Sequence, residues 1–174
     1  MRAQVVYESM FGNTAAVAEA VATGLRPSFE VTVSSVAEAA NHPAPQVDLL
    51  VVGGPTHAFG LSRTVTRRDA ADRTDDPVEI EIGIREWLDA ALPVQASRSA
   101  AAFGTKIARP PWLPGSAAKG IAKRLRHLGY HLAVPPADFL VEDMTGPLGP
   151  GELRRATEWT ARLSAATPRQ TNGR

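Results

Sequence analysis

The strongest structural signal in the sequence is Leu49-Leu50-Val51-Val52, a run of four apolar residues that ends at Gly53-Gly54-Pro55. A continuous apolar run closed by turn-forming residues is typical of a central parallel strand that is covered on both faces. A second β-prone run, Val5-Val6-Tyr7, stops at a loop-like cluster over residues 8–14. The two runs predict neighbouring strands of a buried sheet.

Helical periodicity separates the predicted strands. Val17, Val21 and Leu25 recur at i, i+4 and i+8, which predicts an amphipathic helix that closes near residues 24–27. By similar patterns we expect helices over 80–92, 119–128 and 153–163, and strands at 29–33, 100–103, 132–134 and 139–141. Strands that alternate with helices imply βαβ crossovers, and therefore an α/β fold with a parallel sheet and helices on both faces.

Composition narrows the class of protein. The chain has 174 residues, 44% of them hydrophobic and 21% charged, which predicts one domain over residues 1–166 and a flexible tail over 167–174. It has no cysteine, which excludes disulfides, thiolate metal sites and thiol nucleophiles, so any redox chemistry requires a bound cofactor. No apolar run approaches the roughly 18 residues of a membrane span, and we expect a cytoplasmic protein.

Charge is distributed unevenly along the chain. Residues 62–77 hold four Arg and four Asp with no apolar period, which predicts a solvated insertion. Residues 98–135 hold seven cations and no acid. Within that stretch, one helix face carries Lys119, Lys123 and Arg126. Three interpretations fit this face: it docks an acidic redox partner, it attracts the phosphates of a nicotinamide dinucleotide, or it is an ordinary solvated face. No interleaved aromatic and basic pattern is present, so nucleic-acid binding is not expected.

Three loops follow the predicted strands at Tyr7, Val52 and Phe103, and ligands of such sheets bind beyond the carboxyl ends of the strands. The first loop carries hydroxyls and unpaired amides at a helix start, which makes a cradle for an anion, although an ordinary turn capped by Thr14 fits the same residues. Because each charge-assisted hydrogen bond contributes roughly 1.5–3 kcal/mol, four or five would hold a phosphate without a Lys or Arg in the loop. His127 and His131 have metal-like spacing, but Gly129 lies between them and no third ligand is apparent, so no metal is predicted.

The loop sequences resemble those of a known family. Tyr7-Glu8-Ser9-Met10-Phe11-Gly12-Asn13-Thr14 is similar to the FMN phosphate loop of flavodoxins, in the Ser-Met-aromatic-Gly-x-Thr form of flavodiiron proteins and related quinone reductases. The segment 53–60 resembles the flavin-packing loop after strand three, and Phe103-Gly104-Thr105 resembles the start of the third flavin loop. The resemblance runs in order from about Ala3 to Leu163.

This resemblance implies a doubly wound, five-stranded parallel sheet of order 2-1-3-4-5 that binds FMN. It implies no catalytic side chain. The cofactor-binding residues that it implies are Ser9, Met10, Phe11, Gly12, Asn13 and Thr14 around the phosphate, and Pro55, Thr56, His57, Ala58, Phe59, Gly60, Phe103, Gly104, Thr105, Lys106 and Trp112 around the ring.

Some of these residues have a second interpretation. Phe59 is either a flavin-facing ring or a plain core aromatic, and Trp112 either replaces the tyrosine that often stacks on the flavin or anchors a proline-rich loop. Lys106 and Arg109 bring positive charge where flavodoxins are acidic. A unit charge about 8 Å from the ring, at an effective dielectric of about 20, contributes about 2 kcal/mol, or roughly 90 mV for one electron. We therefore expect a less reducing flavin.

Three functions remain open at this point: an electron carrier between protein partners, a small NAD(P)H-dependent quinone reductase, and a binding module that has lost the flavin. The sequence lacks the motifs by which proteins of this topology bind other classes of ligand. The sequence has no Gly-x-Gly-x-x-Gly after the first strand, no Gly-Lys-Ser/Thr, no Gly-x-Ser-x-Gly, and no Asp at the end of the third strand.

Overall fold

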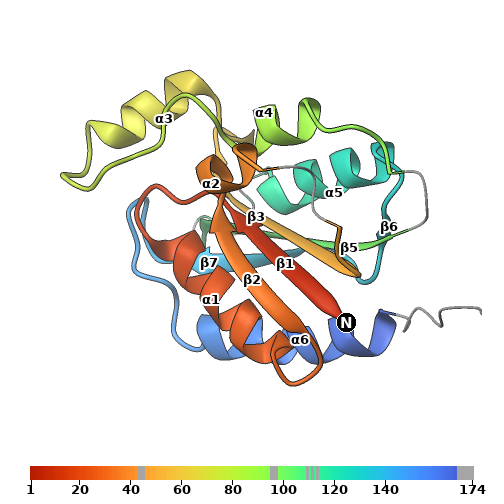
Figure 1. The fold of residues 1–174 in the computed structure, drawn as a ribbon. Helices are drawn as coiled ribbons and strands as arrows, with labels where there is room; N and C mark the ends of the chain where they lie inside the picture. The colour runs from red at the N-terminus through yellow and green to blue at the C-terminus, as the bar shows by residue number, and fades with distance from the viewer. Residues whose placement is uncertain (43–45, 95–97, 109, 111, 113, 168–174) are drawn as a thin grey trace, which may run out of the picture.

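The computed structural model describes residues 1–42, 46–94, 98–108, 110, 112 and 114–167 (Figure 1). Its strands are β1 (Arg2–Tyr7), β2 (Glu30–Ser35), β3 (Leu49–His57), β4 (Gly60–Leu61), β5 (Ser99–Ile107), β6 (His131–Leu132) and β7 (Ala137–Val141). Its helices are α1 (Asn13–Leu25), α2 (Val36–Ala40), α3 (Thr64–Ala71), α4 (Ile84–Asp89), α5 (Ala117–His127) and α6 (Glu152–Ala166). Of the predicted tail, only Thr167 belongs to the described residues, and it is buried.

The parallel sheet has the order β2-β1-β3-β5-β6, and β7 also pairs in parallel with β5. Counted as parallel strands, this confirms the predicted order 2-1-3-4-5, with the fifth strand divided into β6 and β7. The short strand β4 was not predicted; it folds back antiparallel onto the end of β3.

The side chains of the central strands alternate between two cores. Val5, Val51 and Phe103 pack with α1 and α6 on one face, whereas Val6 and Val52 pack with α2, α4 and α5 on the other. Figure 1 shows these two helical layers on either side of the sheet. The buried apolar run at 49–52 therefore has the two-sided cover that its sequence predicts.

Two central strands are longer than the sequence indicates. The prediction that Gly53 and Gly104 end their strands was wrong, because β3 and β5 stay paired through Gly53–Phe103, Gly54–Gly104 and Pro55–Thr105. The ring of Phe103 lies where a Cβ on Gly53 would be, so the glycine is a site of close packing within the strand. Tertiary pairing here overrides the turn propensity of the sequence.

Two helices also differ from expectation. The predicted helix face over 80–92 is reduced to α4, and Leu92 is 82% exposed. The short helix α2 was missed, although Ser35 and Glu38 form the capping box that begins it.

The segment 62–77 is not simply a solvated insertion. Within it, α3 buries the side chain of Arg67 completely. Arg67 donates from Nη1 to Ser62 Oγ at 2.9 Å and to Glu86 Oε2 at 3.1 Å, and from Nε to the Ile80 carbonyl at 2.7 Å. Buried arginines are rare, so a charge-rich segment is normally expected to lie in solvent. For Arg67 this expectation was wrong.

The same cluster holds a second buried charge. Glu8 directly follows β1 and is 3% exposed; it accepts a hydrogen bond from Ser62 Oγ and another from the Ile84 amide at 2.9 Å. We call Glu8, Ser62, Arg67 and Glu86 the buried ionic cluster. Burial raises the pKa of Glu8, against the opposing effects of the Ser62 and Ile84 hydrogen bonds and of the Arg67 charge.

This shift predicts a pH dependence of stability. Because the folded protein holds the Glu8 proton more tightly than the unfolded chain, whose glutamate pKa is about 4.3, the Glu8 contribution to the unfolding free energy is full below that pH. It is lost as pH rises through the raised pKa, at no more than about 1.4 kcal/mol per pH unit. Urea unfolding of the wild type and Glu8→Gln from pH 4 to 8 should show wild-type stability falling relative to the variant.

Glu81→Gln, which removes one exposed negative charge, is the matched control for net charge. The deciding quantity is the unfolding free energy of the wild type minus that of Glu8→Gln. If it stays constant or rises with pH, the folded protein does not favour the protonated Glu8 carboxyl.

Candidate functional site

The first loop connects β1 to α1 at the carboxyl edge of the sheet. Gly12 precedes α1 at φ 83°, a left-handed conformation that glycine adopts without steric cost. The first amides of any helix lack partners within it, so those of α1 are available to a ligand. Ser9 Oγ is, among the residues that the structure describes, the one buried side-chain polar atom without a hydrogen-bond partner. Together these donors form a site suited to an anion.

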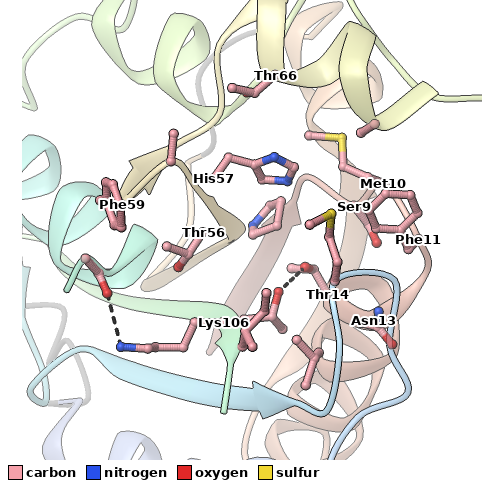
Figure 2. A pocket seen from close by; sticks show the side chains of 18 of the residues that line it. Ser9, Met10, Phe11, Asn13, Thr14, Thr56, His57, Phe59, Thr66 and Lys106 are labelled. Carbon is pink, nitrogen blue, oxygen red and sulfur yellow. Dashed lines mark hydrogen bonds between the residues drawn. The ribbon is translucent and has the colours of Figure 1, made fainter. Parts of the chain in front are cut away.

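Thr14 links the first loop to the third. Its side chain is buried, and its Oγ1 lies 2.8 Å from Thr105 Oγ1, a hydrogen bond that is drawn in Figure 2. Asn13 points the other way, where Nδ2 donates to the Thr145 carbonyl at 3.1 Å. The loop is therefore fixed by contacts with β5 and with the segment after β7.

A cavity of about 290 Å³ lies between the three predicted loops (Figure 2). This volume is close to the roughly 300 Å³ at which small-molecule sites in proteins begin. The predicted residues that line it are Ser9, Met10, Phe11, Asn13, Thr14, Pro55, Thr56, His57, Ala58, Phe59, Thr105 and Lys106. Residues separated by almost a hundred positions in the sequence thus share one cavity.

The second loop presents an imidazole and an aromatic ring. Ala58 and Phe59 both have left-handed φ values, 45° and 71°, at the turn between β3 and β4. Phe59 is 60% exposed and lines the cavity, which excludes its interpretation as a core aromatic. Figure 2 shows Phe59 and His57 on the same side of the cavity, with Thr56 between them and Lys106.

His57 has a distinct electrostatic environment. Burial lowers the pKa of its imidazole, and the positive charge of Arg67 lowers this pKa further. At neutral pH the ring is therefore neutral, and it offers one donor and one acceptor to a ligand.

Two of the predicted aromatic residues lie elsewhere. Phe103 does not line the cavity but is fully buried in the core, with its ring centroid 6.2 Å from that of Phe139 and 6.4 Å from that of Trp159. The side chain of Phe103 points to one face of β5 and fills the space beside Gly53, so it cannot reach a ligand at the sheet edge. Trp112 is 78% exposed and is not among the residues that line the cavity.

Three predicted glycines are not among the residues that line the cavity. Gly12 shapes the start of α1, and Gly60 belongs to β4, paired with His57. Gly104 is a close-packing position, because a Cβ there would lie 2.9 Å from the Ala118 amide nitrogen.

The structure adds walls that the sequence did not indicate. Helix α3 contributes Thr66, Asp69 and Ala70, with Arg73 just beyond it; Val141 and Met144 come from the end of β7 and the loop after it. Figure 1 shows α3 projecting above the sheet, and Figure 2 shows Thr66 across the cavity from Lys106. No apolar period marked Thr66, Asp69 and Ala70, because α3 has almost no apolar face. Val141 does end a predicted strand, but its place at the cavity was not predicted.

The cavity has the features that FMN requires of a protein. The buried, unpaired Ser9 hydroxyl and the α1 amides suit a phosphate, and the Pro55, Phe59 and Ile107 side chains offer apolar surface to a flat ring. Across the cavity from Thr66 (Figure 2), Lys106 donates a hydrogen bond from Nζ to the Gly115 carbonyl at 3.2 Å. Among the described residues, no group of His, Asp and Glu is arranged to hold a metal ion.

Comparisons with known proteins agree with this geometry. The sequence profile of the family described as Flavodoxin matches residues 5–87. No curated protein sequence matches the chain. The fold is similar to that of a flavodoxin from the domain Archaea, at 20% identity and a TM-score of 0.64, with 96% of this chain and 99% of that chain covered.

Two further solved structures share the fold. One is a WrbA-like flavodoxin from Agrobacterium tumefaciens, at 20% identity and a TM-score of 0.60, covering 95% of this chain and 96% of that chain. The other is the Flv1 flavodiiron core from Synechocystis sp. PCC6803, at 18% identity and a TM-score of 0.59, covering 96% of this chain and 36% of that chain. In its fold and in the sequence of residues 5–87, the chain is a flavodoxin-like protein, and FMN is the cofactor of that family.

Proposed function

We propose that the chain binds FMN non-covalently in this cavity and transfers electrons through it as a redox carrier. The observation that carries the proposal is Ser9 Oγ at the mouth of α1, a buried hydroxyl that forms no hydrogen bond with any residue that the structure describes. A buried hydroxyl without a partner costs free energy, so its presence in a cavity wall favours a ligand that accepts its hydrogen bond. When bound, FMN supplies the redox chemistry.

The chain's own residues would bind and orient the cofactor. Ser9, with the amides of residues 10–14, would hold the phosphate, and the segments 55–59 and 105–107 would contact the ring. The neutral His57 would exchange hydrogen bonds with the ring or ribityl chain without adding charge. Among the described residues, no helix is long and apolar enough to cross a membrane.

Substitution of Ser9 tests the phosphate site. Since Ser9 Oγ has no protein partner, Ser9→Ala should leave the free energy of unfolding of the apoprotein unchanged or raise it. Loss of one hydrogen bond to a phosphate, worth roughly 1.5–3 kcal/mol, should weaken FMN binding by about ten- to 150-fold. Quenching of FMN fluorescence measures the affinity, and urea unfolding measures the stability.

Ser35→Ala is the matched control, because it removes the capping hydroxyl of α2, and Ser35 is not among the residues that line the cavity. It should lower stability by about 1 kcal/mol and leave the affinity for FMN unchanged. A wild-type protein that is colourless with added FMN, and that does not quench FMN fluorescence at micromolar concentrations, would instead be a flavodoxin-fold binding module without the cofactor.

A second function, reduction of a quinone-like molecule by NAD(P)H, is favoured by one observation. Thr66 and Asp69 of α3, with Arg73 just beyond the helix, add a polar wall to the cavity, which suits a small-molecule reactant beside the ring. For the carrier, stopped-flow mixing with NADPH should reduce the bound FMN only slowly unless a flavoprotein reductase is added. Rapid direct reduction, with steady NADPH oxidation in the presence of a quinone, would make the protein a reductase.

The protein partner of a carrier would be acidic. Lys119, Lys123 and Arg126 are exposed on one side of α5, and an acidic surface would be steered toward them by long-range attraction. This charge distribution supports docking of an acidic redox protein and does not identify it.

Lys106 should raise the reduction potential of the bound flavin, since a positive charge stabilises the anionic reduced ring. Arg109, the other expected cation, lies outside the described residues. Lys106→Met should lower the midpoint potential, by at most about 90 mV for one electron, because solvent screens part of the interaction. A spectroelectrochemical titration measures the shift, with Lys123→Met as a control on exposed α5. An unchanged or higher potential in Lys106→Met would contradict this assignment.

A further inference from the structure

Arg67 is buried but lies outside the cavity wall, so FMN binding as proposed above makes no direct use of it. Its side chain is 0% exposed and donates to Ser62 Oγ, Glu86 Oε2 and the Ile80 carbonyl, with a longer bond from Nη2 to Thr64 Oγ1 at 3.3 Å. An arginine that loses all of its water is retained only where several partners replace that water. The partners of Arg67 come from separate segments, which indicates that it joins them.

The segments that meet at the buried ionic cluster are those that surround the cavity. Glu8 is the residue before Ser9, and Ser62 Oγ connects it to Arg67. Ser62 directly follows β4, whose Gly60 pairs with His57. Glu86 lies in the first turn of α4 and accepts from the Gly83 amide at 2.9 Å. One guanidinium thus connects the first loop, the His57 segment and the start of α4.

Helix α3 has little else to attach it to the protein. Of its eight residues, only Arg67 and Ala70 are buried, and Val65 is 67% exposed. A helix normally attaches through an apolar stripe, which α3 lacks. The polar contacts of Arg67 therefore set where α3 presents Thr66 and Asp69 to the cavity.

The cluster is also packed without free space. A Cβ on Gly83 would collide with Arg67 Nη1 and would lie 2.9 Å from Glu8 Oε2 and 3.0 Å from Ser62 Oγ. At this position even one added methyl group requires the charged groups to move. Gly83 is not among the residues that line the cavity, so this position gives access to the cluster without touching a ligand.

We propose that Arg67 is a positioning residue: its buried guanidinium, held between Ser62–Glu8 and Glu86, locks α3 and the His57 segment onto the first loop and so fixes the shape of the FMN cavity. The part that concerns FMN rests on the function proposed above. The part that concerns α3 and His57 does not require a ligand.

Arg67 also acts on His57 through its charge. The charged side chains that line the cavity with His57 are Asp69 and Arg73 from the α3 segment and Lys106 from β5. Outside the cavity wall, Glu86 pairs with Arg67, and Glu8 is joined to it through Ser62. Arg67 is the one whose charge lowers the pKa of His57. Loss of this charge should therefore raise the pKa of His57. Greater exposure of the ring to water would raise it too, so Arg67→Lys, which keeps the charge, separates the two effects.

The experiment compares Arg67→Met, Arg67→Lys and Gly83→Ala with the wild type. Arg68→Met is the matched control, since Arg68 is the neighbouring arginine of α3 and is exposed. Three quantities are measured: hydrogen exchange of the α3 amides and the His57 pKa by NMR, both in the apoprotein, and the dissociation constant for FMN. Substitutions of residues that support a bound group typically weaken its binding by about ten- to a hundredfold.

Arg67→Met should speed exchange in α3, raise the pKa of His57 and weaken FMN binding by about tenfold or more. Arg67→Lys keeps the charge but loses the separate guanidinium donors that reach Ser62, Ile80 and Glu86. It should keep the lowered pKa of His57, while the amide hydrogens of α3 still exchange faster than in the wild type. Gly83→Ala should speed α3 exchange and weaken FMN with no charge removed. Arg68→Met should match the wild type in all three measurements.

If Arg67→Met does not fold, Gly83→Ala and Arg67→Lys carry the test. Unchanged α3 exchange and FMN affinity in these variants, or effects equal to those of Arg68→Met, would overturn the positioning role while leaving FMN binding by the wild type intact. If the wild type binds no FMN, the proposed function fails, and α3 exchange with the His57 titration still decides whether Arg67 positions the cavity walls.

Discussion

The architecture depends on the parallel pairing of β3 with β1 on one side and β5 on the other. Val52 is in register with both Val6 and Ala102, so the three strands end at the same edge of the sheet. Because these three strands run in one direction, the loops after them converge there without any direct sequence link. Ser9, His57 and Lys106 share a cavity for this reason.

The cavity is built to attract an anion without placing a cation in the first loop. Amides and the Ser9 hydroxyl act at close range, whereas the cationic side chains of Lys106 and Arg73 belong to other walls. Arg67 contributes its charge from behind the wall, where Glu86 and Glu8 balance it. In the proposed FMN site, phosphate recognition and electrostatic tuning of the ring would therefore belong to different parts of the fold, which would let one be altered without the other.

The parts of the site that could be predicted from the sequence are those encoded by local residue order. The first loop follows a β-prone run and precedes an Ala-rich helix, and five of its residues line the cavity as expected: Ser9, Met10, Phe11, Asn13 and Thr14. Phe103 shows where this reasoning fails, since its neighbours in sequence are loop-like but its ring packs against Phe139 and Trp159. Which face of a strand a side chain occupies depends on pairing register, and the register of β5 is set by β3.

Apolar periodicity, turn residues and the absence of cysteine determined the fold class and a dependence on a bound cofactor for any redox chemistry, because these follow from local patterns of burial and chemistry. The strand order was implied by the resemblance of the loops to those of flavodoxins, and the structure has it. The tertiary structure alone decided that α3 forms a wall, that Arg67 is buried and that Ser9 Oγ lacks a partner. The burial of a charge, and the satisfaction of a hydroxyl, depend on groups brought together from distant segments, and no local pattern records which groups those are.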